Sequence, residues 1–102
     1  MTAPRFDELI HAPTRLSLVS LLAATEWAEF RYLREQLGMS DSALSKQLAT
    51  LEQAGYLEVS KSFVGKRPRT SVRLSRDGRR AFDGHVAALQ EIVAQAGARL
   101  LP

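Results

Sequence analysis

Apolar residues recur with the spacing of amphipathic helices through the first half of the chain. A short helical turn is expected from Phe6 to Ile10, followed by a helix that begins near Pro13. Proline suits this place because the first helical turn has no partner for the N–H that proline lacks. The buried stripe of this helix comprises Leu16, Leu18, Val19 and Leu22.

Two further amphipathic helices follow along the chain. The first spans residues 28–37, and the second, capped by Ser40 or Asp41, extends to Ala54. Gly38 between them suits a left-handed C-terminal cap. Their inward faces comprise Phe30, Leu33, Leu37, Leu44, Leu48 and Leu51. Two such helices joined by a tight turn predict a helix-turn-helix.

Beyond Gly55 the hydrophobic period changes to the two-residue alternation of strands. The alternating apolar positions are Leu57, Val59, Phe63, Val72 and Leu74. Between them, the segment from Gly65 to Arg69 is turn-prone and is expected to be a loop. A lone hairpin is marginally stable, so we expect its apolar face to pack on the helices and its tip to stay free.

The last predicted helix follows Ser75, a plausible cap, and carries a heptad-like seam. The seam comprises Phe82, Val86, Leu89, Val93, Ala96 and Leu100. A domain this small offers little to cover the far end of such a helix, so the seam predicts a homodimer interface. The alternative is that the helix folds back on the first helix of its own chain.

Composition places the chain in one ordinary folded domain, because 102 residues with 45% apolar and 25% charged content can bury one modest core. The net charge of +3 is unevenly distributed. The segment from Glu58 to Arg80 contains eight Lys and Arg residues and two acidic residues, which leaves the remainder of the chain negative. This concentration indicates a polyanionic partner; a solvated basic face is the alternative.

Several function classes lack the residues that they need. The chain has no cysteine, and its two histidines, His11 and His85, are too few for an all-imidazole metal site. No phosphate loop, nucleophile elbow or zinc-protease motif occurs, so we expect neither an enzyme nor a bound cofactor or metal. Asp7 and Glu8 oppose a signal peptide, and no apolar run reaches membrane length, so a cytoplasmic protein without a membrane partner is expected.

The helix expected to end at Ala54 has an outward face suited to the DNA major groove, because small and hydrogen-bonding side chains allow close approach to base edges. That face comprises Ser42, Ala43, Ser45, Lys46, Ala49 and Thr50. Gln47 is either a base reader or a packing residue. Similar faces also occur on ordinary exposed helices.

The hairpin tip is the second candidate DNA contact. Lys66, Arg67 and Arg69, stiffened by Pro68, are expected beside the phosphates or in a minor groove. The alternative is a solvated loop that protects the strand edge. RNA binding is disfavoured because Phe63 and Phe82 are expected in the core rather than arrayed for base stacking.

Three stretches of the sequence resemble the winged helix-turn-helix transcriptional regulators related to the MarR and ArsR families. Residues 33–48 resemble the helix-turn-helix core, residues 51–57 the junction into the wing, and residues 67–78 the returning strand with the start of the last helix. The resemblance covers residues 6–93. It implies a mainly α fold with a small β-hairpin wing.

The implied organisation is a single winged helix-turn-helix domain over residues 1–102. Within it, residues 28–54 would form the helix-turn-helix, 57–74 the wing and 76–100 a dimerisation helix. The resemblance implies a homodimer that binds double-stranded DNA at a pseudo-palindromic operator and usually represses transcription.

By the same resemblance, the recognition helix would present Ser42, Ala43, Ser45, Lys46 and Thr50, and the wing would present Lys66, Arg67 and Arg69. Arg34 departs from the family pattern, where a small alanine is common, and the cysteine-containing metal box is absent. Trp27 and Tyr32 could line a pocket for an unknown small-molecule effector, with simple packing as the alternative. A winged-helix module that binds proteins rather than DNA is the competing function.

Overall fold

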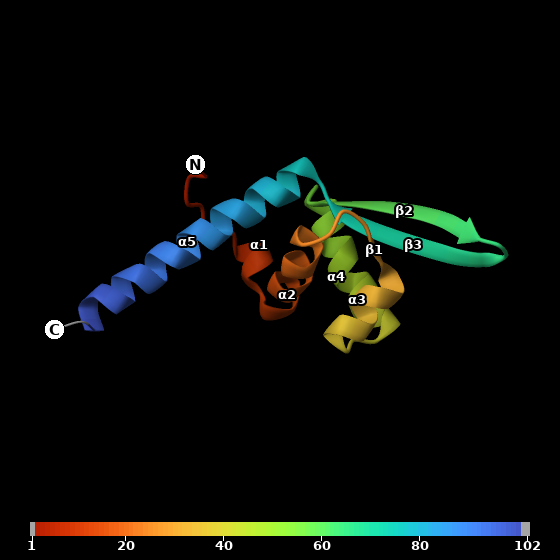
Figure 1. The fold of residues 1–102 in the computed structure, drawn as a ribbon, viewed down its shortest axis with the longest axis horizontal. Helices are drawn as coiled ribbons and strands as arrows, with labels where there is room; N and C mark the ends of the chain where they lie inside the picture. Colours follow the sequence, from red (N-terminus) through yellow and green to blue (C-terminus); the bar gives the residue numbers. More distant parts are fainter. Residues whose placement is uncertain (1, 101–102) are drawn as a thin grey trace.

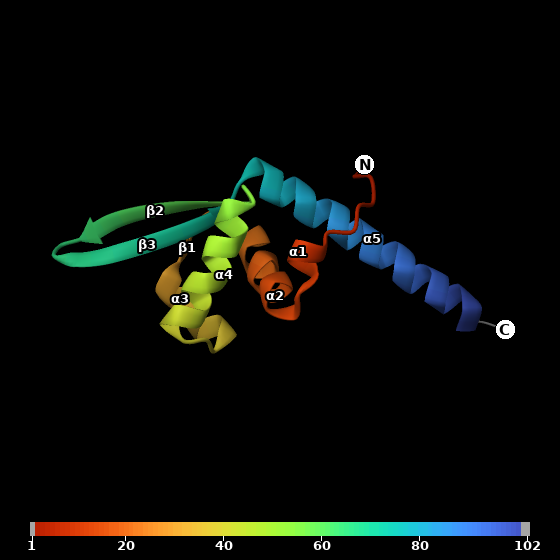
Figure 2. The same ribbon diagram turned by 180° about the vertical axis from the view of Figure 1, so that it is seen from behind.

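The computed structural model describes the backbone of residues 2–100 and the side chains of residues 2–97. It is an elongated molecule, 62 Å along its longest axis, in which the helices pack into a body and both a hairpin and the last helix project from it (Figures 1 and 2). The elements are α1 (Glu8–His11), α2 (Pro13–Ala23), β1 (Ala28–Glu29), α3 (Phe30–Leu37), α4 (Asp41–Gln53), β2 (Leu57–Val64), β3 (Arg67–Leu74) and α5 (Arg76–Leu100).

The core forms where the apolar stripes of α2, α3 and α4 meet the body end of the hairpin. Its buried members include Leu18, Val19, Leu22, Leu33, Leu44, Leu48, Leu51, Leu57, Val72 and Leu74. Phe30 and Leu37, half-buried, pack against this cluster. The inward faces predicted for these helices are therefore confirmed, except at Leu16 of α2, which is half-buried and lies outside this cluster.

The predicted helix caps are also confirmed. Gly38 ends α3 in the left-handed region, with φ of 63°. The Ser40 hydroxyl accepts a hydrogen bond from the Ala43 N–H at 3.2 Å, and so satisfies a donor that has no partner inside α4. Ser75 accepts from the Gly78 N–H at 3.0 Å in the same way at the start of α5.

The prediction that residues 28–37 form one helix is wrong at its first two positions. Ala28 and Glu29 form the short strand β1, which pairs with β3 through Val72 and Ser71 and gives the antiparallel order β1-β3-β2. Ala28 is buried in this arrangement. Helical periodicity could not reveal the strand, because its partner lies more than 40 residues away along the chain.

The hairpin β2–β3, here called the wing, has longer strands and a shorter connection than the sequence predicted. Its strands are joined by Gly65 and Lys66 alone, with positive φ at Gly65. Arg67, Pro68 and Arg69 therefore lie in β3 and not in a loop. Placing Phe63 in the core is also wrong, since its side chain is 73% exposed. The wing extends beyond the helices, so nothing in the described chain covers it there (Figure 1).

Helix α5 starts against the body and then leaves it (Figure 1). Phe82 packs against the core, Val86 and Leu89 are half-buried, and Val93 is 69% exposed. The first part of the predicted seam thus packs on its own chain, and the later part does not. The side chain of Leu100 lies outside the described residues.

Gly78 permits the close approach of α5 to the segment between α4 and β2. A Cβ atom at this position would lie 2.1 Å from the backbone oxygen of Tyr56. We expect Gly78→Ala to lower the free energy of unfolding by about 1–3 kcal/mol, because one of the two backbones must move. Urea denaturation measures this change.

Gly97→Ala is the matched control on the same helix, because a Cβ there meets nothing within 4 Å. It should leave stability unchanged or raise it by up to about 1 kcal/mol. Equal effects of the two substitutions would contradict the proposed close approach.

Candidate nucleic-acid interface

The outer side of α4 carries the side chains that the sequence predicted for a reading surface. Ser42, Ser45 and Lys46 are exposed, and Ala43 and Thr50 are half-buried. The opposite side is anchored by the buried leucines of the core. The Thr50 hydroxyl donates to the carbonyl of Lys46 at 3.1 Å, so its orientation is set within the helix.

Gln47 occupies a different environment from the other predicted readers. Its side-chain oxygen accepts a hydrogen bond from the Arg15 guanidinium of α2 at 3.1 Å. Arg15 is itself held by the carbonyl oxygen of Leu9. Of the two interpretations left open by the sequence, this contact favours packing between α2 and α4.

Arg34, the departure from the family pattern, joins the two helices of the helix-turn-helix. Its guanidinium lies 2.8 Å from a carboxylate oxygen of Asp41, the first residue of α4. The pair is largely exposed, so its expected contribution to stability is below about 1 kcal/mol.

Helix α4 and the wing share one concave surface. A cleft of about 370 Å³ lies between them, and its lining includes Ser45 and Ala49 of α4 and Val59, Lys61 and Thr70 of the wing. The candidate reading face and the inner face of the wing therefore open on the same side of the molecule. A rod-shaped partner that touches one of them can reach the other.

The predicted cations of the wing do not share one electrostatic environment. Lys66 lies in the turn and Arg67 at the start of β3, both exposed. Arg69 lies 3.6 Å from a carboxylate oxygen of Glu29 in β1. Part of the charge of Arg69 is thus compensated within the chain, whereas no ion pair is formed by Lys66 or Arg67 among the described residues.

Arg73 of β3 forms its contacts on the outer face of the wing. Its guanidinium forms an ion pair with Glu58 at 2.5 Å and lies 4.5 Å from the centre of the Trp27 ring. Trp27 therefore supports Arg73, while Tyr32 lies exposed on α3. Neither of these two aromatics lines the cavity described next.

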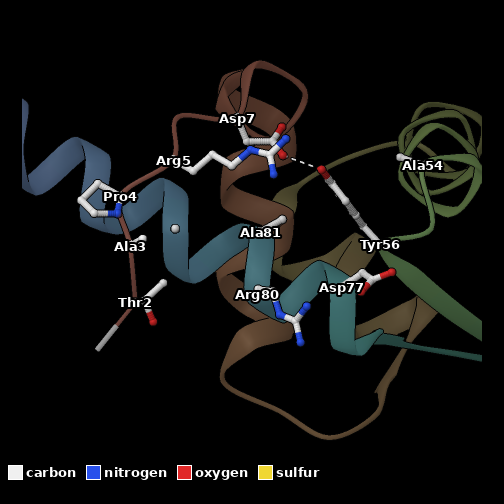
Figure 3. A pocket seen from close by; sticks show the side chains of 11 residues that line it. Thr2, Ala3, Pro4, Arg5, Asp7, Ala54, Tyr56, Asp77, Arg80 and Ala81 are labelled. Carbon is white, nitrogen blue, oxygen red and sulfur yellow. Dashed lines mark hydrogen bonds between the residues drawn. The ribbon is translucent and has the colours of Figure 1, made fainter.

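A cavity of about 750 Å³ lies where the N-terminal segment crosses the start of α5 (Figure 3). Charged and polar groups of Arg5, Asp7, Tyr56, Asp77 and Arg80 line it. The Tyr56 hydroxyl donates to an Asp7 carboxylate oxygen at 2.5 Å, and this bond is the main cause that raises the pKa of Tyr56 to about 12. Sequence reasoning missed this site because nothing local links residues so far apart in the chain.

Next to this cavity, two histidines connect α1 to α5. His85 is fully buried, and its Nδ1 accepts a hydrogen bond from the Asp7 N–H at 3.0 Å. Its other nitrogen, Nε2, lies 3.2 Å from Nδ1 of His11. Because Nδ1 accepts, a neutral His85 carries its proton on Nε2 and donates a hydrogen bond from this N–H to Nδ1 of His11. Burial, followed by the nearby His11, lowers the pKa of His85 below its ordinary 6.5.

We expect the free energy of unfolding to decrease as the pH falls below 6.5. The unfolded chain takes up a proton at His85 with its ordinary pKa, whereas the folded chain resists protonation until a lower pH. A His85→Gln variant should lose this part of the pH dependence in urea titrations between pH 5 and 8.

His11→Gln is the matched control, because His11 is exposed while its partner is buried. It should retain most of the acid destabilisation. If wild type and His85→Gln lose stability equally between pH 8 and 5, the buried histidine is not the cause.

Within residues 2–100, no helix is both long and apolar enough to cross a membrane. Those residues likewise contain no group of three or more His, Cys, Asp and Glu side chains placed to hold a metal ion.

Comparison with known proteins finds one sequence relative and several solved structures that share this architecture. An uncharacterized protein of Methanocaldococcus jannaschii, MJ0432, is 29% identical over 85 residues, covering 83% of this chain and 92% of that protein. A transcriptional regulator homologue from Pyrococcus horikoshii has a TM-score of 0.82 at 21% identity, with 88% of this chain and 89% of that chain covered. The PcaV transcriptional regulator from Streptomyces coelicolor, solved with its natural ligand, has a TM-score of 0.73 at 20% identity, with 94% and 67% covered.

These structural likenesses confirm the fold expected from the sequence, and MarR family members are among the structures that share it. The family model for the winged helix DNA-binding domain matches residues 14–93, which include α2 to β3 and most of α5. The chain belongs to the winged helix DNA-binding domain family.

Proposed function

We propose that this protein is a homodimeric transcriptional regulator that binds a pseudo-palindromic operator in double-stranded DNA and represses transcription from it. The observation that carries the proposal is the concave surface shared by α4 and the wing, with Ser45, Ala49 and Lys61 in its lining. One B-form duplex could occupy this surface, with its major groove on α4 and its flanking backbone on the wing.

Sequence preference would come from α4, and most of the affinity from neutralised phosphates. In this scheme the side chains that approach the base edges are Ser42, Ala43, Ser45, Lys46 and Thr50. Gln47 positions α4 through its contact with Arg15. The wing residues that lie along the DNA backbone are Lys66, Arg67 and Arg69. The exposed outer side of α4 supports this division because it lacks the apolar residues that a protein-binding groove would need.

The dimer would form through the part of α5 that leaves the body. Ile92 and Val93 are 53% and 69% exposed, and Ala96 is exposed one turn further. Together with Leu89, and with Leu100 beyond, they would form the contact with a second α5, while Phe82 and Val86, the earlier residues of the predicted seam, pack on their own chain. A twofold dimer of this kind places two recognition helices about 34 Å apart, one turn of DNA.

A small-molecule effector is the remaining partner in the proposal. PcaV is a regulator of similar fold that was solved with a natural ligand. The cavity lined by Arg5, Tyr56 and Arg80 is a better candidate for such a ligand than a pocket at Trp27 and Tyr32, because neither of these aromatics lines it. Its contacts with both α5 and the segment after α4 would let a ligand alter the angle between the dimer helix and the reading helix.

Selection of bound duplexes from a random pool, combined with size determination of the complexes, tests the proposal. We expect an enriched, inverted-repeat sequence and two chains per duplex. Lys46→Ala should change the enriched sequence rather than only weaken binding. If binding shows no sequence enrichment and the purified protein instead retains a protein partner, the winged-helix interaction module is the correct function.

A further inference from the structure

The two faces of the wing differ in chemistry beyond the body. Cross-strand register pairs Val59 with Val72, Lys61 with Thr70, and Phe63 with Pro68. Since side chains alternate between faces along a strand, all these residues share the face that is buried in the core near the body. The inner face of the wing therefore ends in an apolar pair, Phe63 and Pro68.

This apolar pair continues the concave surface shared with α4. Lys61 and Thr70 line the cleft beside α4, and Phe63 and Pro68 lie two residues further out on the same two strands. Two residues correspond to about 7 Å along a strand. The phenyl ring is 73% exposed and is thus a large apolar group presented on the side where α4 presents its polar face.

The residues around the apolar pair indicate which partner would cover it. Between Lys61 and Thr70 the sequence has four cations and no acidic residue. Lys66 adjoins the pair in the turn between the strands, Lys61 lies on the same face, and Arg67, the partner of Val64, lies at the tip on the other face. Lys61 and Lys66 border the apolar pair, whereas the acidic residues of the cleft, Asp41 and Glu52, lie on its α4 side. The outer part of the wing is therefore complementary to a polyanion with apolar edges, such as a nucleic acid duplex.

We propose that Phe63, fixed beside the rigid ring of Pro68, packs against the deoxyribose walls of the DNA minor groove next to each half-site. This inference rests on the proposed function and adds a non-ionic contact to it. Apolar side chains placed in the minor groove contribute to binding by excluding water from sugars and base edges. The cations at the tip neutralise phosphates, whereas the ring contributes independently of salt.

Salt dependence separates these two contributions. Binding through phosphates weakens with salt at a slope set by the number of neutralised phosphates, while an apolar contact shifts affinity equally at every salt concentration. We expect Phe63→Ala to weaken binding about tenfold between 50 and 300 mM KCl without changing the slope. Fluorescence anisotropy with the selected operator, and with a mixed-sequence 30-base-pair duplex, measures both quantities.

Val64→Ala is the matched control, because Val64 is 47% exposed on the same strand but on the other face. It should change the affinity less than twofold. Phe63→Leu, which keeps an apolar side chain, should recover most of the loss. Thermal unfolding of Phe63→Ala should match wild type, since the ring contacts no part of the core.

Three results would overturn the inference. Phe63→Ala could bind like Val64→Ala, or it could change the salt slope, which would assign Phe63 an electrostatic role. It could also change the size of the free protein in sedimentation, which would place the ring in a protein contact. If wild type itself binds neither duplex, the proposed function fails together with this inference; the first three results leave DNA binding intact.

Discussion

Replacing Lys66 and Arg67 by glutamine should flatten the salt dependence of operator binding more than any other change in the wing. Both side chains are exposed, and neither has an ion pair among the residues that the structure describes. If each contacts one phosphate, a dimer loses about four phosphate contacts, and the slope of log K against log salt decreases by about 3–4. The affinity at low salt should fall by two orders of magnitude or more, for operator and unrelated duplexes alike.

Replacing Arg76 and Arg80 by glutamine removes the same two charges from exposed positions on α5 and is the control for an effect of net charge alone. Arg69→Gln is expected to change the slope less than Lys66→Gln, because Glu29 already compensates part of its charge. An unchanged slope in the double variant would show that the wing does not contact DNA. The measurement is a series of binding titrations from 50 to 300 mM salt.

Arginine at Leu89 and Val93 should convert the protein into a folded monomer. Val93 is exposed and Leu89 half-buried on the part of α5 that leaves the body, so two added charges would oppose its association with a second α5. Because a dimer binds its second half-site at a high effective concentration, we expect the monomer to bind the operator about 100-fold more weakly. Sedimentation and operator titration measure the two effects separately.

Gln95→Arg is the matched control, since residue 95 lies on the opposite side of the helix from residue 93. It should remain dimeric with unchanged operator affinity. If the double variant stays dimeric, α5 does not form the interface by this seam. If it becomes monomeric but binds the operator as well as wild type does, dimerisation is not what produces affinity.

The N-terminal segment would couple these two activities. The carboxylate of Asp7 accepts a hydrogen bond from Tyr56, which follows α4. The backbone N–H of Asp7 donates to His85, which lies in the middle of α5. The Arg5 N–H also donates to the carbonyl of Gly84 at 2.9 Å. This N-terminal segment thus connects α5, the proposed dimer helix, with the end of α4, the proposed reading helix. The same segment forms one wall of the cavity in Figure 3.

Most of the local structure could be predicted from the sequence. The apolar spacing of α2 and α4, the glycine after α3 and the serine caps before α4 and α5 all act within a few residues, and the structure contains each of them. The outward face of α4 follows from the same spacing, because leucines that must be buried determine which side chains remain outside.

The errors occurred where distant parts of the chain meet. Ala28 and Glu29 continue the helical spacing of the following residues but pair with β3. Phe63 continues the apolar alternation of the buried strand positions, but it lies on the part of the wing that the helices do not cover. The predicted wing loop is too long because the two strands continue to pair up to Val64 and Arg67, where no alternation of apolar residues marks a strand.

Local periodicity, caps and charge distribution were thus determined by the sequence, because they depend on forces between near neighbours in the chain. Only the tertiary structure decided that α4 and the inner face of the wing border one cleft, that Gln47 is held by Arg15, and that Asp7 joins Tyr56 to His85. These contacts depend on packing between segments as many as 78 residues apart, which no short-range pattern records.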